Sequence, residues 1–285
     1  MYINDIDNGL NNLISKFADD TKIGSTVITE NDKLNLQNDL NKITDWSEKW
    51  EMPFNIDKCQ ILHVGTRNPK FDYELCGEKL KNSSKVKDLG VTVESNLKFA
   101  KQCKDAAAKA NRMLGFIKRN FSFKSKEIVL PLYKSLVRPH LEYAVQFWSP
   151  HHEKDIAKLE SVQRRATKMI PSLRNKSYEE RLVNLNLFTL RKRRLRGKLI
   201  ECFKILKGFT NVDFDKLFLI DDTSRTRNNG HKLKCRQVRS DCTKFFFTND
   251  VVREWNKLPP LAVQCNTIDS FKNKLDSHLL EQGYR

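Results

Sequence analysis

The 285-residue sequence has no apolar run long enough to cross a membrane, and its N-terminus does not resemble a secretion signal. It also has no internal repeat and no low-complexity segment. These features argue against integral membrane proteins, secreted proteins and repeat arrays. We therefore expect an intracellular protein, nuclear or cytoplasmic, that is not secreted and has no membrane partner.

Paired cysteines are also missing. The seven cysteines are odd in number and irregularly spaced, which does not match a disulfide framework and suits a reducing compartment. The closest approach to a zinc-ligand set is His231, Cys235, Cys242 and Cys265. Zinc sites usually carry ligands in closely spaced pairs, so we interpret these cysteines as buried or incidental.

Acidic charge is scarce in the middle of the chain. Residues 101–200 carry 24 basic and 8 acidic side chains, against 13 and 16 in residues 1–100 and 15 and 11 in residues 201–285. The net charge of +17 is therefore concentrated in one segment. Such a segment is typical of proteins that bind a polyanion, because each phosphate neutralised by Lys or Arg releases condensed counterions. We expect RNA or DNA as the partner.

Two adjacent carboxylates, Asp19 and Asp20, lie between short apolar-rich segments. Residues 13–17 and 23–28 are predicted strands, and residues 18–22 are the predicted tight turn between them. A nucleotidyl-transfer site uses carboxylates at such a tip to hold two Mg²⁺ ions about 3.5–4 Å apart. One ion would activate the attacking 3′-hydroxyl, and the other would neutralise the leaving pyrophosphate. A solvated turn is the alternative, since turns are commonly rich in aspartate.

Up to about residue 95 the hydrophobic pattern is that of an α+β fold. Apolar residues recur at steps of three and four from Leu36 to Trp50, which predicts an amphipathic helix that Pro53 ends. Residues 59–64 and 89–93 are predicted strands, separated by a charged loop at residues 77–87.

From residue 101 the pattern is helical. The predicted elements are helices over residues 103–117, 156–169 and 190–207, an apolar segment over residues 128–148 that Pro131 and Pro139 break, a short helix that a Ser177–Glu180 capping box begins, a polar loop over residues 209–244, and two short helices around Trp255 and over residues 271–279.

Several short segments follow one another at a spacing that is typical of one enzyme family. They are Tyr2-Ile3-Asn4-Asp5-Ile6, Phe17-Ala18-Asp19-Asp20-Thr21, Trp50-Glu51-Met52-Pro53-Phe54-Asn55 with Lys58-Cys59, Leu89-Gly90-Val91, the stretch from Leu132 to Tyr143, the stretch from Val162 to Lys168, and Trp255-Asn256-Lys257-Leu258-Pro259. In this order they resemble the C-terminal half of the reverse transcriptase of a non-LTR, LINE-type retrotransposon of the jockey or CR1 kind. The resemblance runs from end to end.

The resemblance implies a partial polymerase palm over residues 1–95, a mainly helical basic thumb over residues 96–208 and a helical C-terminal extension over residues 209–285. It implies that Asp19 and Asp20 are catalytic residues that bind Mg²⁺ in the intact enzyme, whereas this fragment alone would bind Mg²⁺ weakly or not at all. A sheet made of this hairpin, a helix and further strands would carry them.

Two further sites follow from the resemblance. Lys58 would assist the pyrophosphate leaving group, because an ammonium offsets charge that develops there. Leu89, Gly90 and Val91 would form the primer grip, where glycine lets the backbone approach the primer closely. The alternatives are a surface lysine before a strand and an ordinary glycine at a turn.

The template-primer duplex would be held by basic residues of the thumb. They are Lys104, Arg112, Arg164, Arg165, Lys168, Arg191, Lys192, Arg193, Arg194 and Arg196. Like charges four residues apart on a helix repel one another, so phosphates explain such a cluster better than solvent does. Solvated helix faces are the alternative. The helical spacing of Tyr143, Phe147 and Trp148 favours a place in the core, and stacking on bases is the alternative.

In that family the palm strand with the first catalytic aspartate, the fingers and the endonuclease precede the segment that begins here at Tyr2. We therefore expect a fragment of an RNA-directed DNA polymerase that is inactive alone, with the N-terminal polymerase half as a partner. Two alternatives stay open: a non-catalytic nucleic-acid-binding protein that keeps the basic thumb, and a translated remnant without function. We also expect the palm part to fold poorly, because a sheet that lacks a strand leaves an edge unpaired.

Overall fold

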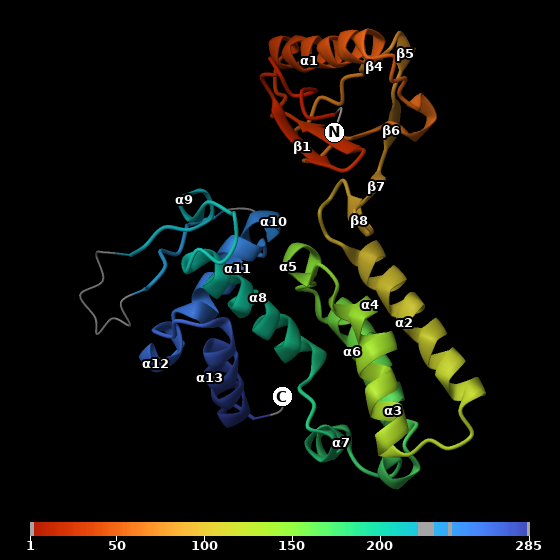
Figure 1. The fold of residues 1–285 in the computed structure, drawn as a ribbon, viewed down its shortest axis with the longest axis vertical. Helices are drawn as coiled ribbons and strands as arrows, with labels where there is room; N and C mark the ends of the chain where they lie inside the picture. The colour runs from red at the N-terminus through yellow and green to blue at the C-terminus, as the bar shows by residue number, and fades with distance from the viewer. Residues whose placement is uncertain (1–2, 222–230, 239–240, 284–285) are drawn as a thin grey trace. The chain divides into compact units, whose positions relative to one another are not determined.

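The computed structural model describes residues 3–221, 231–238 and 241–283. The chain divides into two compact units, Met1–Leu97 (unit 1) and Lys98–Arg285 (unit 2), each of which is described by itself (Figure 1). Unit 1 contains a helix and short strands, and unit 2 is helical. The mixture of helices and strands agrees with the predicted α+β class.

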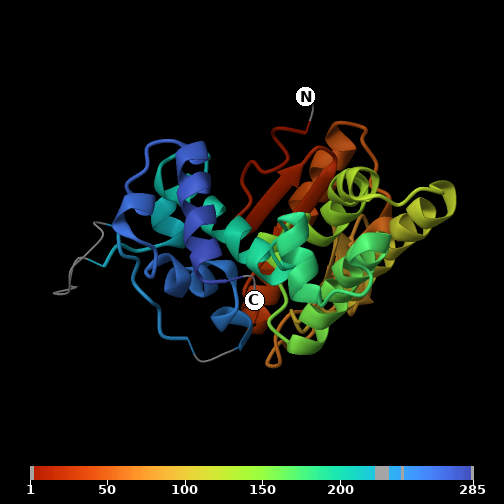
Figure 2. The ribbon, with the colours of Figure 1, turned by 90° about the horizontal axis from the view of Figure 1, so that it is seen from below.

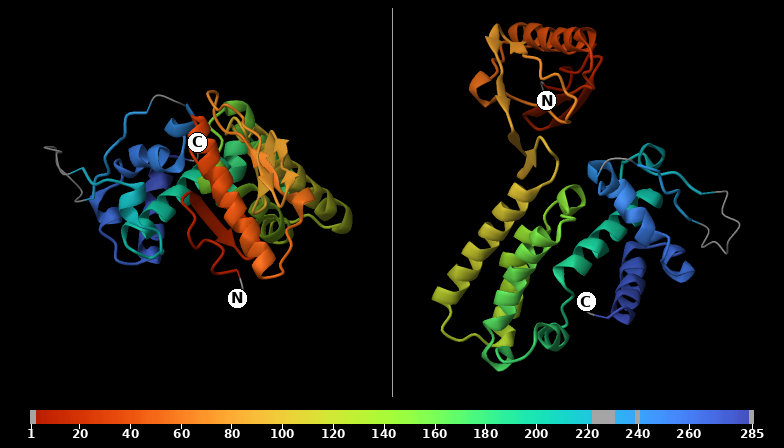
Figure 3. Two further views of the ribbon diagram at one scale, coloured as in Figure 1. Left: turned by 90° about the horizontal axis from the view of Figure 1, so that it is seen from above. Right: turned by 180° about the vertical axis from the view of Figure 1, so that it is seen from behind.

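Unit 1 is built from one long helix and four pairs of short strands. Its elements are β1 (Leu13–Phe17) paired with β2 (Asp20–Gly24), α1 (Glu30–Lys49), the 3-10 turn η1 (Ile56–Lys58), β3 (Gln60–Leu62) paired in parallel with β6 (Lys81–Ser83), β4 (Glu74–Leu75) paired with β5 (Glu78–Lys79), and β7 (Lys85–Asp88) paired with β8 (Val91–Glu94). In Figure 3, α1 lies across one side of these strands.

The sequence of α1 explains where it begins and what it covers. Thr29 and Asp32 form a capping box, in which each side chain accepts a hydrogen bond from the other residue's backbone N–H. Leu40 and Ile43 of the helix lie in a core of six buried apolar residues. The other members of this core are Ile6, Tyr73, Leu75 and Leu80. This is a small core, so unit 1 depends strongly on each of its contacts.

A buried carboxylate fastens β1 to α1. Asp39 Oδ2 accepts hydrogen bonds from the backbone N–H of Asn11 and of Asn12, each at 2.9 Å, and from Asn12 Nδ2 at 2.8 Å. Burial raises the pKa of Asp39, but these hydrogen bonds and one from Lys42 hold it below its ordinary value. The carboxylate therefore stays charged and fixes the start of the hairpin.

One loop prediction in unit 1 needs correction. The loop predicted over residues 77–87 contains β5, β6 and most of β7. Charged side chains alternate with few apolar ones there, so the strands lack the hydrophobic pattern that marks a half-buried sheet. Cys76 and Gly77, with φ values of 52° and 75°, make the two-residue turn between β4 and β5.

Unit 2 contains the remaining helices. They are α2 (Ala100–Asn120), α3 (Lys126–Leu132), the π-helical turn η2 (Tyr133–Val137), α4 (Arg138–Glu142), α5 (Val145–Trp148), α6 (Glu153–Lys168), the 3-10 turn η3 (Pro171–Leu173), α7 (Tyr178–Leu185), α8 (Leu190–Leu206), α9 (Phe214–Leu217), α10 (Asp241–Lys244), α11 (Phe247–Trp255), α12 (Pro260–Val263) and α13 (Ile268–Glu281). None of the helices in the described ranges is long and apolar enough to span a bilayer.

Several helix predictions for unit 2 are confirmed. The apolar segment with Pro131 and Pro139 is an exception, because it stays helical from α3 through the π-helical turn η2 to the end of α4 and is interrupted at Tyr143 and Ala144, before α5. Ser177 and Glu180 form the predicted capping box at the start of α7. The short helices expected around Trp255 and over residues 271–279 are α11 and α13.

The C-terminal residues pack on α8 and do not form a separate unit. Phe203 of α8 stacks on Phe271 of α13 with ring centroids 4.2 Å apart, and Trp255 is fully buried in the same core. The side chain of Asn256 exchanges two hydrogen bonds with the backbone of Leu233, at 2.9 and 2.8 Å. The structure therefore has one compact unit where the sequence predicts a thumb and an extension that meet at residue 208.

Candidate nucleic-acid interface

The carboxylate pair lies at the tip of a tight hairpin. Phe17 pairs with Asp20, so the turn consists of Ala18 and Asp19 alone, and β2 begins three residues earlier than predicted. Ala18 has a φ of 53°, the left-handed conformation that two-residue hairpin turns use. Both carboxylates are exposed. Figure 2 shows the two strands side by side.

These carboxylates do not complete a metal site. Mg²⁺ takes oxygen ligands, which Asp19 and Asp20 offer, but in the described ranges no three His, Cys, Asp or Glu side chains come close enough to hold a metal ion. The residues present therefore do not fit a two-metal site by themselves. Of the cysteines in the zinc set, Cys235 is exposed and Cys265 is buried, and the side chain of Cys242 lies outside the described residues.

The predicted primer grip forms a second hairpin in unit 1. Leu89 and Gly90, with φ values of 43° and 84°, make the two-residue turn between β7 and β8, so the strand begins at Val91 and not at Leu89. Leu89 and Gly90 are exposed, whereas Val91 is buried and belongs to the core. Only the turn residues of this predicted site are accessible.

An ion pair joins the two hairpins. Lys22 Nζ of β2 lies 2.7 Å from Asp88 Oδ2, the last residue of β7. Both side chains are partly exposed, so the pair contributes at most about 1 kcal/mol. Its importance is geometric, because it connects residues next to the Asp-Asp turn with the residue before the Leu89-Gly90 turn.

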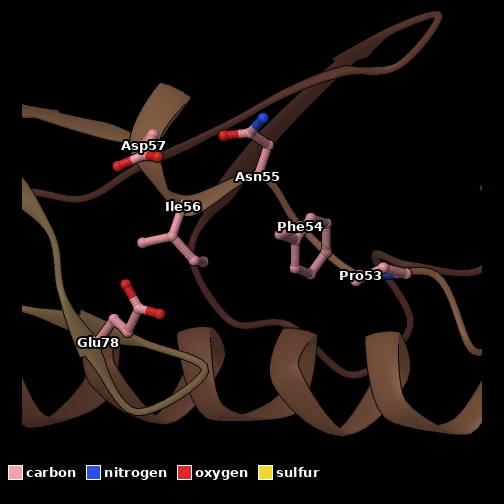
Figure 4. Close-up of a pocket in the computed structure, with 6 residues that line it drawn as sticks. All are labelled: Pro53, Phe54, Asn55, Ile56, Asp57 and Glu78. Carbon is pink, nitrogen blue, oxygen red and sulfur yellow. The ribbon is translucent and has the colours of Figure 1, made fainter.

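Lys58 is exposed at the end of η1. An open hollow of about 450 Å³ lies next to it and is lined by Pro53, Phe54, Asn55, Ile56, Asp57 and Glu78 (Figure 4). Its two charged lining residues are both acidic, which does not favour phosphate or pyrophosphate. The hollow therefore gives no support to a leaving-group role for Lys58.

The basic cluster of α8 lies differently from its prediction. Lys192 and Arg194 are only 8% and 3% exposed. Lys192 Nζ donates to the carbonyl oxygen of Leu279 at 2.9 Å and to that of Gly283, so it binds the negative C-terminal end of α13. Burial lowers the pKa of Arg194, whose Nη1 and Nη2 have no hydrogen-bond partner among the described residues. Both side chains lie inside unit 2, and this burial gives no support to a contact with a duplex on its surface.

The other cations of the cluster form ion pairs. Arg193 binds Glu142 of α4 through two hydrogen bonds, and Arg196 binds Asp276 of α13 in the same bidentate way. Arg191 is exposed, with its Nη1 2.9 Å from Glu153 Oε1. The charges of α8 therefore mainly hold other helices of unit 2 in place. The sequence shows the cations but not their partners, which lie 38 to 80 residues away.

Exposed basic residues lie instead on α2 and α6. These helices pack side by side through small and aliphatic residues, among them Ala106, Ala110 and Leu159, which are buried. We call seven of their exposed cations the α2/α6 basic surface: Lys104, Lys109, Arg112, Lys154, Arg164, Arg165 and Lys168. Five of these seven residues are among the predicted nucleic-acid contacts. Lys154 was missed because it lies before the apolar stripe of its helix.

A buried polar network positions α6, which carries part of this surface. Tyr133 donates to Gln163 Oε1 at 2.7 Å, and Gln163 Nε2 donates to the Tyr178 hydroxyl oxygen at 2.9 Å. Tyr178 in turn donates to Glu160, which accepts from the backbone N–H of Leu190 at 3.0 Å. A carboxylate at the first turn of α8 also stabilises the helix dipole. The stretch from Leu132 to Tyr143 and the stretch from Val162 to Lys168 are therefore joined inside unit 2, and α6 is fixed to α8.

The network also fixes one of the surface arginines, because the guanidinium of Arg164 lies 4.0 Å from the centroid of the Tyr178 ring. Burial raises the pKa of both Tyr133 and Tyr178, so they stay neutral donors at physiological pH.

The aromatic residues considered for base stacking differ in exposure. Trp148 is fully buried and its Nε1 donates to the carbonyl oxygen of Tyr143. Tyr143 and Phe147 are exposed, and Phe147 meets Phe99 edge to face at 5.3 Å. The core interpretation is thus correct for Trp148 alone.

Comparison with protein-family models, with curated proteins and with solved structures finds no match for the chain. A function is therefore inferred from the residues described above and from the order of the sequence segments.

Proposed function

We propose that the chain is the thumb-bearing part of a non-LTR retrotransposon reverse transcriptase, and that by itself it holds nucleic-acid duplexes without polymerising. The α2/α6 basic surface carries this proposal. Its seven cations are exposed on α2 and α6, which pack against each other, and a buried network fixes α6 to α7 and α8. Cations held on a rigid surface lose little entropy when they bind phosphates, and the backbone contacts they make need no base sequence.

The hairpins of unit 1 support the polymerase assignment. A two-residue turn displays Asp19 and Asp20, and the Lys22–Asp88 ion pair links it to the Leu89-Gly90 turn. This pair of turns corresponds in sequence order to the catalytic and primer-grip segments of the family. We assign Asp19 and Asp20 to Mg²⁺ only in an assembled enzyme, where the N-terminal polymerase half completes the ligand set.

Salt-dependent binding tests the proposal. The full chain should bind a duplex of about 20 base pairs with an affinity that falls steeply with salt, at a slope of about 0.9 per phosphate contacted on DNA. Arg164→Gln, Arg165→Gln and Lys168→Gln together should reduce the slope by up to about three such units and weaken binding to RNA–DNA hybrid and duplex DNA alike.

A matched control removes the same charge elsewhere. Lys216, Lys257 and Lys272 are partly or fully exposed cations of α9, of the turn after α11 and of α13. Changing these three to glutamine should leave the slope almost unchanged. Equal effects of the two triple variants would show that only net charge matters, and would refute a defined interface on α2 and α6.

A non-catalytic nucleic-acid-binding protein is the second candidate, favoured by the incomplete ligand set at the Asp-Asp turn. The two candidates differ when the N-terminal polymerase half is supplied in trans. Primer extension on an RNA template that depends on Asp19 supports the polymerase, whereas a stable complex that extends no primer supports the binding protein.

A further inference from the structure

The turn between α2 and α3 exposes two aromatic rings. Phe123 is 82% exposed and lies three residues after the end of α2, and Phe116 on the last turns of α2 is 47% exposed. Single exposed apolar side chains are common on protein surfaces. This turn differs because cations are interleaved with the rings: residues 115–126 contain four basic residues, three phenylalanines and no acidic residue.

The backbone of the turn is well defined. Phe121 N–H donates to Ile117 O at 3.2 Å and Asn120 Nδ2 donates to Phe116 O at 2.9 Å, which together close the C-terminal end of α2. Val129 N–H donates to Ser125 O at 2.9 Å, at the start of α3. The short connection leaves Phe123 no path back to the core, so its ring faces solvent.

More cations lie at this end of unit 2. Lys126 Nζ donates to the carbonyl oxygen of Asn184 on α7 at 2.9 Å, and Lys176 Nζ lies 3.4 Å from Asn184 Oδ1. In Figure 1, α3 and α7 lie at the same end of unit 2. The exposed side chains of Lys118 and Arg119 add two charges that no acidic residue of the turn itself offsets.

The turn continues the α2/α6 basic surface. Phe116 and Arg119 lie four and seven residues after Arg112, so these three side chains share one face of α2. A duplex held along α2 would therefore bring its end, or the strand that continues from it, to the turn. Paired bases are stacked inside a duplex and offer no free face, whereas unpaired bases can stack on aromatic rings while cations bind their phosphates.

We propose that the α2–α3 turn binds the unpaired strand that continues from a duplex held on α2 and α6, with Phe116 and Phe123 stacking on bases and Lys118 and Arg119 binding phosphates. This assignment rests on the proposed duplex-holding function. An anionic membrane would also match exposed rings among cations, but the continuity with a surface made only of cations favours nucleic acid.

The experiment compares two hybrids in binding to the full chain. One is a blunt RNA–DNA hybrid, and the other is the same hybrid with a single-stranded RNA overhang of about six nucleotides that contains 2-aminopurine. The wild-type chain should bind the second hybrid more tightly and change its 2-aminopurine fluorescence. Phe123→Ala should weaken binding of the overhang hybrid at least about fivefold, the effect of one lost stack, and leave the blunt hybrid unchanged.

Leu261→Ala is the matched control, because Leu261 is a 68% exposed apolar residue on α12. It should change neither affinity. Both substitutions lie on the surface, so circular dichroism and the melting temperature should stay at wild-type values.

Three results overturn the assignment, and they are distinguishable. Equal wild-type affinity for both hybrids, with the Arg164, Arg165 and Lys168 variant still impaired, refutes the turn but leaves the proposed function standing. If the wild-type chain binds neither hybrid, the proposed function itself is refuted. Binding to phosphatidylserine–phosphatidylcholine vesicles that Phe123→Ala abolishes, with no effect of that substitution on the hybrids, makes the turn a membrane contact.

Discussion

Replacing Arg193 should destabilise unit 2 without lowering its affinity for nucleic acid. Arg193 and Glu142 are 21% and 22% exposed and are joined by two hydrogen bonds, so Arg193→Gln leaves a largely buried carboxylate without its main partner. Removing one member of a fully buried pair costs about 3–5 kcal/mol, and an exposed pair contributes about 0–1 kcal/mol. Arg138 Nε lies 3.8 Å from Glu142 Oε2 and offsets part of the loss. We therefore expect Arg193→Gln to lower the free energy of unfolding by about 2 kcal/mol.

This loss should lower the melting temperature of unit 2 by about 4–8 °C, at about 2–4 °C per kcal/mol for a domain of 150–250 residues. Calorimetry or circular dichroism measures the shift, and anisotropy at several salt concentrations measures duplex binding. Arg165→Gln is the matched control. Arg165 is exposed, with a single long contact of 3.4 Å to Ser161 Oγ. The Arg165→Gln variant should therefore keep the wild-type melting temperature and bind the duplex more weakly.

A double-mutant cycle with Glu142→Gln separates the pair from other effects of each substitution. The two changes together should cost clearly less than the sum of the single changes, because either one already breaks the pair. An Arg193→Gln variant with an unchanged melting temperature and a weaker duplex affinity would refute the structural role assigned to α8.

Two further outcomes concern unit 1. Its amides should exchange hydrogen faster than those of α2, α6 and α8, because its core is small and large side chains such as Leu13 and Phe17 are exposed on β1. Equal protection of the amides in both units would contradict this expectation. The lowered pKa of Asp39 contributes stability that is present above the unfolded pKa of about 3.9 and is lost as pH falls through the folded pKa. Asp39→Asn should therefore flatten the loss of stability below about pH 4 in urea titrations, and an unchanged acid profile would show that other carboxylates dominate.

Local patterns in the sequence were enough for most of unit 2. The small and aliphatic face of residues 103–117 is buried as predicted, and the capping box at Ser177 begins α7. Gly208, with a φ of 70°, follows the end of α8 as a C-terminal glycine should. These features depend on neighbours within a few residues, which the sequence places directly.

Long-range pairing was beyond the sequence. Arg196 meets Asp276 across 80 residues and Lys192 meets the end of α13, so a run of cations that resembles a phosphate-binding face is mostly internal. In unit 1, Phe17 pairs with Asp20, so the turn is shorter than predicted. The strands within residues 77–87 were not predicted, because their many charged residues give no alternating hydrophobic pattern. Burial of a charge is decided by its partner, which periodicity does not reveal.

Chemical footprinting of lysines in the presence of duplex tests the central proposal most directly. Acetylation of the full chain, read by peptide mass spectrometry, compares Lys104 and Lys168 of the α2/α6 basic surface with Lys216 and Lys257, which are exposed elsewhere in unit 2. Bound RNA–DNA hybrid should protect the first pair and leave the second pair reactive, while the buried Lys192 reacts poorly in both states. Protection of Lys216 and Lys257, with Lys104 and Lys168 still reactive, would place nucleic acid on another surface and contradict the proposal.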